Sequence, residues 1–481
     1  MNRPRTTRPP GQWSGAGGLD RLSLQDVSNL RVEARGLPMH VAALAILEGA
    51  PLCDAEGRLR LDAVQAWIER RLHLAPRLRQ VLHRAPLGFG PPVWADDAGF
   101  HIGNHVRTRA IGPPGDEAAL LEACTDLNQA PLDRSRPLWE LWLLTGLTGG
   151  NVGVLIRLHH VVADGIAGVA LFASMFDLAP DAPSPPAPPW IPAPIPSWWE
   201  LLTDNLRRHR AALGGALSRL GHPVRVLRPL RANAAQLGGL LREGLAPRSS
   251  LNRTVGRHRR LLLVRADLET ARQVAHAHGA KVNDVVLAGV AGGARELLRH
   301  RGELAPGLRL RAGVPVSMRG AGNPGASGNL VGVMLVGLPV AEPDPVRRLE
   351  QLARATAARK RRPPYQPGAR LEQHGVVWVM AHQRLVNLFT SNVPGPPVPL
   401  YVAGARILEL FQIGVIQGNV TVSVGVLSYA GQLNFDILGD ADACPDLAVF
   451  AAGLQGALHE LGVGAPMPQA SGPLSVSRAA S

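Results

Sequence analysis

The sequence contains few cysteines and no long apolar run, and both absences narrow the class of protein. Its three cysteines, Cys53, Cys124 and Cys444, are far apart and form no CxxC pair. We therefore expect free thiols in a reducing compartment and no disulfide framework. No run reaches the roughly 18 apolar residues of a transmembrane helix, and the first residues carry positive charge without an apolar segment behind it. This predicts a chain that neither spans a membrane nor carries a secretory signal peptide.

Aromatic residues and lysines are also scarce. Aromatic side chains make up 4% of the chain, so few candidates exist for stacking on single-stranded nucleic acid. The net charge of +14 is carried almost entirely by arginine, because Lys281 and Lys360 are the only lysines. Between Asn205 and Arg260 the chain has thirteen arginines and a single acidic residue, Glu243. We expect this basic stretch to meet a membrane surface or a phosphate-bearing small molecule, and not nucleic acid.

The composition predicts an ordered protein with local irregular segments. Hydrophobic residues make up 46% of the 481 positions, and 53 glycines and 42 prolines together stay near a fifth. The patterns divide the chain into a flexible tail at 1–18, an α/β block at 19–180, a proline-rich then basic helical linker at 181–254, a second α/β block at 255–465 and a tail at 466–481. Two α/β halves predict a ligand channel at their interface.

The linker contains the strongest amphipathic pattern. After the proline-rich residues 179–196, apolar residues recur at helical spacing over 197–220, with arginines on the other face. This predicts a helix. Two interpretations stay open: the apolar stripe packs on the protein, or it lies on a membrane surface.

A polar cluster with the sequence HHVVADG follows an apolar strand at 151–160. Successive side chains of a strand point to opposite faces, so His159 and His160 cannot both face the same cavity, and one of them has a structural role. Asp164 can fold back to fix the local backbone, and Gly165 permits a positive φ or a close approach of substrate.

Other catalytic chemistries find little support. The two histidines lack the i, i+4 spacing of a helical zinc motif, and no cysteine or third histidine lies nearby in the sequence. We therefore expect no metal site. The chain has no GxSxG sequence, and its cysteines lack a nucleophile context. These observations favour histidine as a base acting on a bound hydroxyl. The alternative is a pair of structural histidines at a strand end.

HHVVADG resembles the HHxxxDG active-site signature of the CoA-dependent acyltransferase superfamily. Further segments, in matching order over residues 20–465, resemble its bacterial wax ester synthase/diacylglycerol acyltransferase branch. They are LSLQD at 22–26, PMHV at 38–41, PLWE at 137–140, SSLNRTVGRHRR at 249–260, VNDVVLA at 282–288, VPVSMR at 314–319, GNLVG at 328–332 and SNVPGP at 391–396. One departure is Asn252-Arg253-Thr254, where the family tends to have Asn-Gly-Pro. The resemblance implies two chloramphenicol-acetyltransferase-like subdomains with mixed sheets and an active-site channel at their interface.

The resemblance also assigns catalytic roles. His160 would be the general base that takes the proton from an alcohol, with His159 behind it and Asp164 and Gly165 shaping the loop. Asn283 would either donate a hydrogen bond to the developing oxyanion or cap the helix that follows it.

The same likeness places substrate near two further segments. Pro137, Leu138 and Trp139 would either line the acyl tunnel or pack in the core. Ser391 and Asn392, in a turn stiffened by two prolines, would lie near the channel. Asp284 would hold substrate or have a structural role.

The implied reaction moves a long acyl chain from acyl-CoA, as co-substrate and with no bound cofactor, to diacylglycerol or a fatty alcohol. We expect the protein in the cytoplasm, peripherally associated with the inner membrane face or with lipid inclusions. An alternative is a non-catalytic protein that coats such a surface through its basic linker. A peptide-condensation domain shares the histidine motif, but no carrier-protein module lies beside it here.

Overall fold

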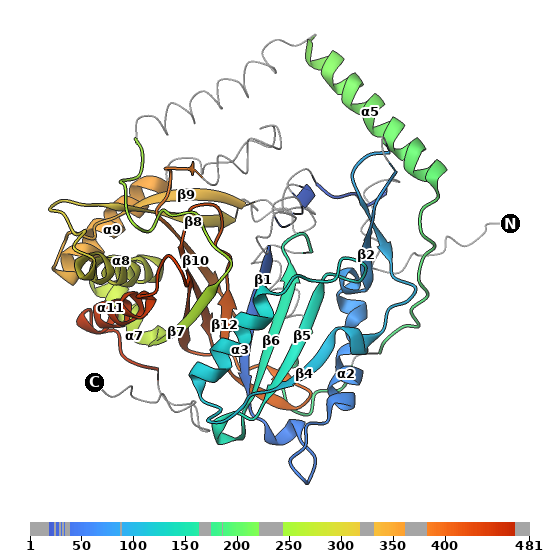
Figure 1. The fold of residues 1–481 in the computed structure, drawn as a ribbon, viewed down its shortest axis with the longest axis horizontal. Helices are drawn as coiled ribbons and strands as arrows, with labels where there is room; N and C mark the ends of the chain where they lie inside the picture. Colours follow the sequence, from blue (N-terminus) through green and yellow to red (C-terminus); the bar gives the residue numbers. More distant parts are fainter. Residues whose placement is uncertain are drawn as a thin grey trace.

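The computed structural model describes residues 19–23, 26–27, 30, 33, 39–86, 89–162, 175–184, 186–220, 244–317, 331–360 and 382–466. Two six-stranded sheets, one in each half of the molecule, form its framework (Figure 1). This confirms the predicted α/β class and its two halves with mixed sheets.

The first sheet has the strand order β11-β12-β1-β6-β5-β4. Its neighbours are antiparallel except for β4 and β5, which are parallel. Apolar side chains of α2 pack on one face and those of α3 on the other. The elements are β1 (His40–Leu47), α2 (Leu61–Glu69), β4 (Val106–Ala110), α3 (Glu117–Gln129), β5 (Trp139–Thr145), β6 (Val152–His159), β11 (Tyr401–Val402) and β12 (Ala405–Ile413), with β2 (Gln80–His83) and β3 (Val93–Asp96) as a separate hairpin.

The second sheet has the order β7-β14-β13-β10-β8-β9, with β10 parallel to both of its neighbours. The central helix α8 packs closely against α11, because glycines remove side chains where the two helices meet. A Cβ atom at Gly292 would lie 2.2 Å from the Cβ of Ala457. The elements are β7 (Arg259–Asp267), α7 (Leu268–Ala277), α8 (Val282–His300), β8 (Leu310–Ser317), β9 (Val331–Leu338), α9 (Pro345–Lys360), β10 (Leu388–Pro394), β13 (Val422–Tyr429), β14 (Gln432–Asp440) and α11 (Leu447–Glu460).

Strand β12 joins the two halves. It comes late in the chain but pairs with β1 of the first sheet, with Ala42 opposite Ile413. Arg265 of β7 contacts Glu409 of β12 and Glu117 of α3, each at 2.6 Å, so three elements meet at one guanidinium group. Burial lowers the pKa of Arg265, but the two carboxylates raise this pKa by more than burial lowers it. The arginine therefore stays charged. The division of the chain predicted near residue 255 does not account for this crossover.

Two of the helices predicted from the sequence are confirmed, and one predicted turn is partly wrong. The helices predicted at 197–220 and 282–300 are confirmed as α5 (Trp198–Leu220) and α8. The turn predicted at 391–396 is wrong for its first part, since β10 extends to Pro394. The prolines that suggested a turn lie at and after the end of this strand, where no further ladder hydrogen bond is lost.

Asp436 is a fully buried carboxyl group in the second sheet. Asp436 of β14 accepts a long hydrogen bond, 3.4 Å, from the N–H of Gly414. Its cross-strand partner is Gly425, where a Cβ atom would lie 1.9 Å from Oδ1 of Asp436. Burial without a charged partner raises the pKa of Asp436 to about 8.

The raised pKa of Asp436 predicts that stability falls as pH rises. Between about pH 4 and pH 8 the unfolded chain loses this proton while the folded protein keeps it, which weakens folding by up to about 1.4 kcal/mol per pH unit. Asp436→Asn should flatten that slope in urea unfolding measured from pH 5 to pH 9. The exposed Asp442→Asn is the matched control and should keep the wild-type slope. Parallel curves for Asp436→Asn and wild type would contradict the assignment.

Candidate functional site

The histidine pair lies at the end of β6, in the interior of the first sheet. His159 is the last residue of the strand and pairs in register with His40 of β1. Its side chain is completely buried, whereas His160, one residue further on, is half-buried. The backbone N–H of His160 donates to the carbonyl of Met39 at 2.9 Å. The two imidazoles therefore lie in different environments, as strand alternation predicts.

A carboxylate that the sequence did not single out holds the buried ring. Glu33 places Oε2 at 3.2 Å from Nε2 of His159 and Oε1 at 2.7 Å from Nε2 of His40. Arg134 approaches the same carboxylate, with Nε at 3.1 Å from Oε2. Burial raises the pKa of Glu33, but the two imidazoles and the guanidinium group more than offset this, so its pKa lies far below the usual range.

A second acidic residue of the N-terminal segment lies near His160. Burial raises the pKa of Asp26, while hydrogen bonds from Ser23 and the nearby His160 and His159 act in the opposite direction. Leu22, from the same LSLQD segment, packs in one apolar cluster with Val161, which follows His160. This segment therefore covers the end of β6. Asp164 and Gly165 lie outside the described residues.

The side chains of Leu138 and Trp139, in the PLW segment at the start of β5, belong to different apolar clusters. Leu138 is buried in the cluster that also contains Val161. Trp139 points to the other side, is 1% exposed and donates from Nε1 to the carbonyl of Leu78 at 2.8 Å. Its ring also stacks on His105, with the ring centroids 4.7 Å apart. Pro137, which precedes them, is buried.

A small apolar cavity lies beside Trp139, within the first half. Trp67 of α2, Val154 of β6 and Met175 are among the other side chains that line it. Trp139 therefore combines core packing with the wall of a cavity, and its role in holding an acyl chain stays a prediction.

The other predicted residues meet in the second half. Asn392 of β10 donates from Nδ2 to Oδ1 of Asn283, in the first turn of α8, at 3.3 Å. Asn283 is not the N-cap of this helix, because the cap residue is Lys281. The buried carboxylate of Asp284 does the capping: it accepts the N–H of Lys281 at 2.9 Å and the hydroxyl hydrogen of Thr356 at 2.7 Å.

Ser391 and Asn392 are adjacent strand residues, so their side chains leave opposite faces of β10. Asn392 contacts α8 on one face. The carbonyl of Ser391 accepts a hydrogen bond of 2.9 Å from Nε2 of Gln412, which belongs to the crossover strand β12. The histidine pair and the asparagine pair thus belong to different halves, and β12 connects the sheets that carry them.

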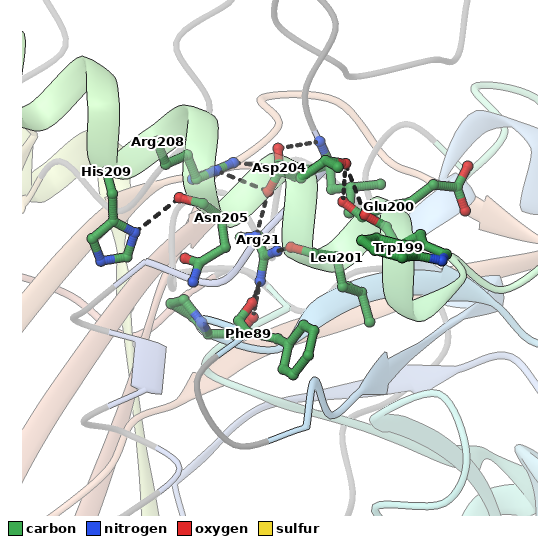
Figure 2. A network of polar contacts seen from close by, with 12 residues as sticks. Arg21, Phe89, Trp199, Glu200, Leu201, Asp204, Asn205, Arg208 and His209 are labelled. Carbon is green, nitrogen blue, oxygen red and sulfur yellow. Dashed lines mark hydrogen bonds and ion pairs between the residues drawn. The ribbon is translucent and has the colours of Figure 1, made fainter.

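The linker helix α5 contacts the body at its first turns (Figure 2). Asp204 accepts from Nε of the buried Arg21 at 2.6 Å, and Arg21 also donates to the carbonyls of Leu201, Phe89 and Pro91. Leu201 of the apolar stripe is buried, whereas the helix is exposed from Leu206 to Gly214, and α5 projects at the periphery of the molecule (Figure 1). Its large exposed side chains are Trp198, Trp199, Leu206 and Leu213.

In the part of the chain that the structure describes, no group of three or more His, Cys, Asp or Glu side chains has an arrangement that could hold a metal ion. Across the same residues, no helix combines the length and apolar character needed to cross a membrane.

Comparison with known proteins gives matches over nearly the whole chain. The model of the wax ester synthase/diacylglycerol acyltransferase catalytic domain matches residues 22–286, and that of the WS/DGAT C-terminal domain matches residues 327–462. Relatives named diacylglycerol O-acyltransferase in Mycobacterium bovis and Mycobacterium tuberculosis are each 32% identical over 478 residues, covering 92% of this chain and 96% of theirs.

Solved structures share the two-half architecture. The wax ester synthase/diacylglycerol acyltransferase of Marinobacter aquaeolei is 25% identical, with a TM-score of 0.65 over 92% of this chain and 98% of that one. The starter condensation domain of rhizomide synthetase, at 14% identity, has a TM-score of 0.60 over 95% and 96% of the two chains. The second likeness concerns the fold alone.

The contacts of Asp284 predict a structural effect that its neighbour Asn283 does not share. Asp284→Ala removes the acceptor of the Lys281 N–H and the nearer of two acceptors of the Thr356 hydroxyl, and should lower the free energy of unfolding by roughly 2 kcal/mol. Asn283→Ala and the exposed helix-start variant Glu269→Ala should each stay within about 0.5–1 kcal/mol of wild type. Urea unfolding measures all three. A wild-type midpoint for Asp284→Ala would contradict the capping role.

Proposed function

The chain belongs to the wax ester synthase/diacylglycerol acyltransferase family and is an acyltransferase, and we propose that His160 is its general base. The proposed reaction moves a long acyl chain from acyl-CoA to the hydroxyl group of diacylglycerol or of a fatty alcohol, giving triacylglycerol or wax ester. The observation that carries this proposal is the contrast within the histidine pair: His159 is sealed in the first half, whereas His160 is half-buried just beyond the strand end.

In the proposed mechanism the His160 imidazole removes the proton of the acceptor hydroxyl as its oxygen attacks the thioester carbonyl. A tetrahedral intermediate forms, and its collapse breaks the carbon–sulfur bond. The protonated imidazole then returns the proton to the leaving CoA thiolate. One imidazole serves as base and acid, so the reaction needs no covalent acyl-enzyme.

The second half would supply the oxyanion contact in this mechanism. Asn283 lies in the first turn of α8, where unpaired N–H groups and the helix dipole favour negative charge. Its Oδ1 is engaged by Asn392, which leaves the Nδ2 hydrogens of Asn283 as the donor end of that amide. We assign Ser391, Asn392 and the PLW residues to the surroundings of the substrate, with Asp164 and Gly165 shaping the loop after the base.

The assay that tests this function gives purified full-length protein radiolabelled palmitoyl-CoA with either dioleoylglycerol or hexadecanol. We expect labelled ester from at least one alcohol. His160→Ala should lower kcat by roughly 10²–10⁴-fold, because a positioned general base contributes about that much. His258→Ala, at an exposed histidine, is the control and should keep wild-type kcat. Ester formation that survives His160→Ala would remove His160 as the base.

A second proposal concerns where the reaction takes place. We propose that α5 lies on an anionic membrane or lipid-inclusion surface in the cytoplasm, which would bring the site close to lipid alcohols. Trp198 and Trp199 stack on each other at 4.0 Å between ring centroids and remain exposed, and Arg207 and Arg210 are exposed on the same helix. Exposed indole rings with neighbouring arginines are typical of helices that lie at the surface of a bilayer.

Liposome flotation tests the second proposal. Arg207→Glu with Arg210→Glu should lower partitioning onto anionic vesicles at least roughly tenfold, since each arginine near such a surface contributes about 1 kcal/mol. Arg208 is left unchanged because it contacts Asp204 at the root of the helix. The matched control reverses Arg347 and Arg354, which are similarly exposed on α9. Equal loss in both pairs would contradict a role for α5, and vesicle binding without any acyl transfer would favour a non-catalytic surface protein.

A further inference from the structure

We propose that Glu33 is a positioning residue for the His160 base and acts through the ring of His159; this inference rests on the proposed function. Glu33 does not touch the reacting atoms in this scheme. It fixes the orientation of a buried imidazole, and that imidazole in turn fixes the turn of backbone that presents His160.

The carboxylate of Glu33 is enclosed by three side chains from three places in the first half. Its side chain is 7% exposed, and the rings of His40 and His159 that flank it are 0% exposed. Arg134 approaches Oε2 with both Nε and Nη2, at 3.1 and 2.5 Å. The guanidinium group balances the charge of Glu33, so the carboxylate is stable in this dry position and both oxygens remain directed at the imidazoles.

The other nitrogen of the His159 ring is also used. Nδ1 accepts the backbone N–H of Val161 at 3.1 Å, which requires Nδ1 to be unprotonated. In the neutral ring the proton then sits on Nε2, which faces Oε2 of Glu33 at 3.2 Å. The carboxylate and the Val161 amide therefore select the same tautomer and the same ring orientation.

One of the three hydrogen bonds that hold the backbone around His160 depends on this arrangement. His160 N–H donates to Met39, Val161 N–H donates to the His159 ring, and Val162 N–H donates to the His159 carbonyl at 2.8 Å. The middle one of these three bonds is lost if the ring rotates. Without the charge of Glu33, Nε2–H loses the carboxylate that lies 3.2 Å away, and with it the electrostatic attraction that favours this ring orientation. The base would then be displaced from the hydroxyl, and a displacement of about 1 Å is enough to slow a reaction roughly 10²-fold.

The test measures kcat and KM of the full-length protein with palmitoyl-CoA and whichever alcohol it esterifies. Glu33→Gln should lower kcat by roughly 10- to 100-fold and leave KM for palmitoyl-CoA within about twofold. The kcat is normalised to the concentration of folded protein, which circular dichroism measures. Glu56→Gln, the same substitution at an exposed position, is the matched control and should keep wild-type kcat. If Glu33→Gln does not fold, Glu33→Asp, which keeps the charge and withdraws it by one methylene, should show a loss of kcat with KM unchanged. Wild-type kcat in a folded Glu33 variant overturns the inference.

A double-mutant cycle separates positioning from a general effect on packing. In His159→Asn the amide oxygen can still accept the Val161 N–H, while the contact with Glu33 is gone. Adding Glu33→Gln to His159→Asn should therefore change kcat by less than about twofold, since the partner through which Glu33 acts is already absent. Effects on kcat that multiply would overturn the inference. Loss of activity in His160→Ala together with normal kcat in folded Glu33→Gln sinks this inference alone, whereas activity in His160→Ala sinks the proposed function.

Discussion

The different surroundings of the two histidines depend on the position at which strand β6 ends, between His159 and His160. Strand β6 is buried along its whole length, because apolar side chains pack on both faces of the first sheet, and its last residue, His159, is fully buried. The next residue leaves the strand and carries a half-buried ring. A shift of the pairing by one residue would turn the ring of His159 to the other face of the sheet and away from Glu33. The register of His40 opposite His159 therefore determines which imidazole can meet a substrate.

That register is supported from the other half of the molecule. Strand β12 pairs with β1 on the side away from β6, and its Gln412 side chain reaches back to the carbonyls of Ser391 and Val426 in the second sheet. Arg265 and Glu409 add a buried ion pair at the same junction. The strand that aligns the first sheet thus also fixes the position of the second half.

Much of the fold follows from sequence patterns, and the missing parts have physical causes. The apolar periodicity of α8 and the helical spacing of α5 are strong local signals, and both helices occur where the patterns predict them. The crossover of β12 is a choice of partner between strands far apart in the chain, which no local pattern encodes. The strand at 391–394 was hidden by the prolines that follow it.

Some residues of the site could likewise be predicted from the sequence, and others could not. HHVVADG and the ordered segments around it predicted His160, and strand alternation predicted that the other ring is structural. Glu33 was not predicted, because a carboxylate seven positions before His40 resembles any surface glutamate until the strands are paired. Asn283 was expected as a possible helix cap, but the cap interaction belongs to Asp284, one residue on, which reaches back to Lys281. The hydrogen-bond distances in the structure show which of these two neighbouring residues makes the cap interaction, and the sequence alone does not.

The central claim is that one imidazole transfers the proton while the acyl group passes directly from thioester to alcohol. The most direct measurement is to incubate the purified protein with radiolabelled palmitoyl-CoA in the absence of any alcohol, denature it rapidly and determine the label bound to protein by intact-mass spectrometry and scintillation counting. The account predicts no covalently bound acyl group, and release of CoA that begins only when a lipid alcohol is added. A stoichiometric acyl adduct on a side chain, chased into ester by alcohol, would contradict it.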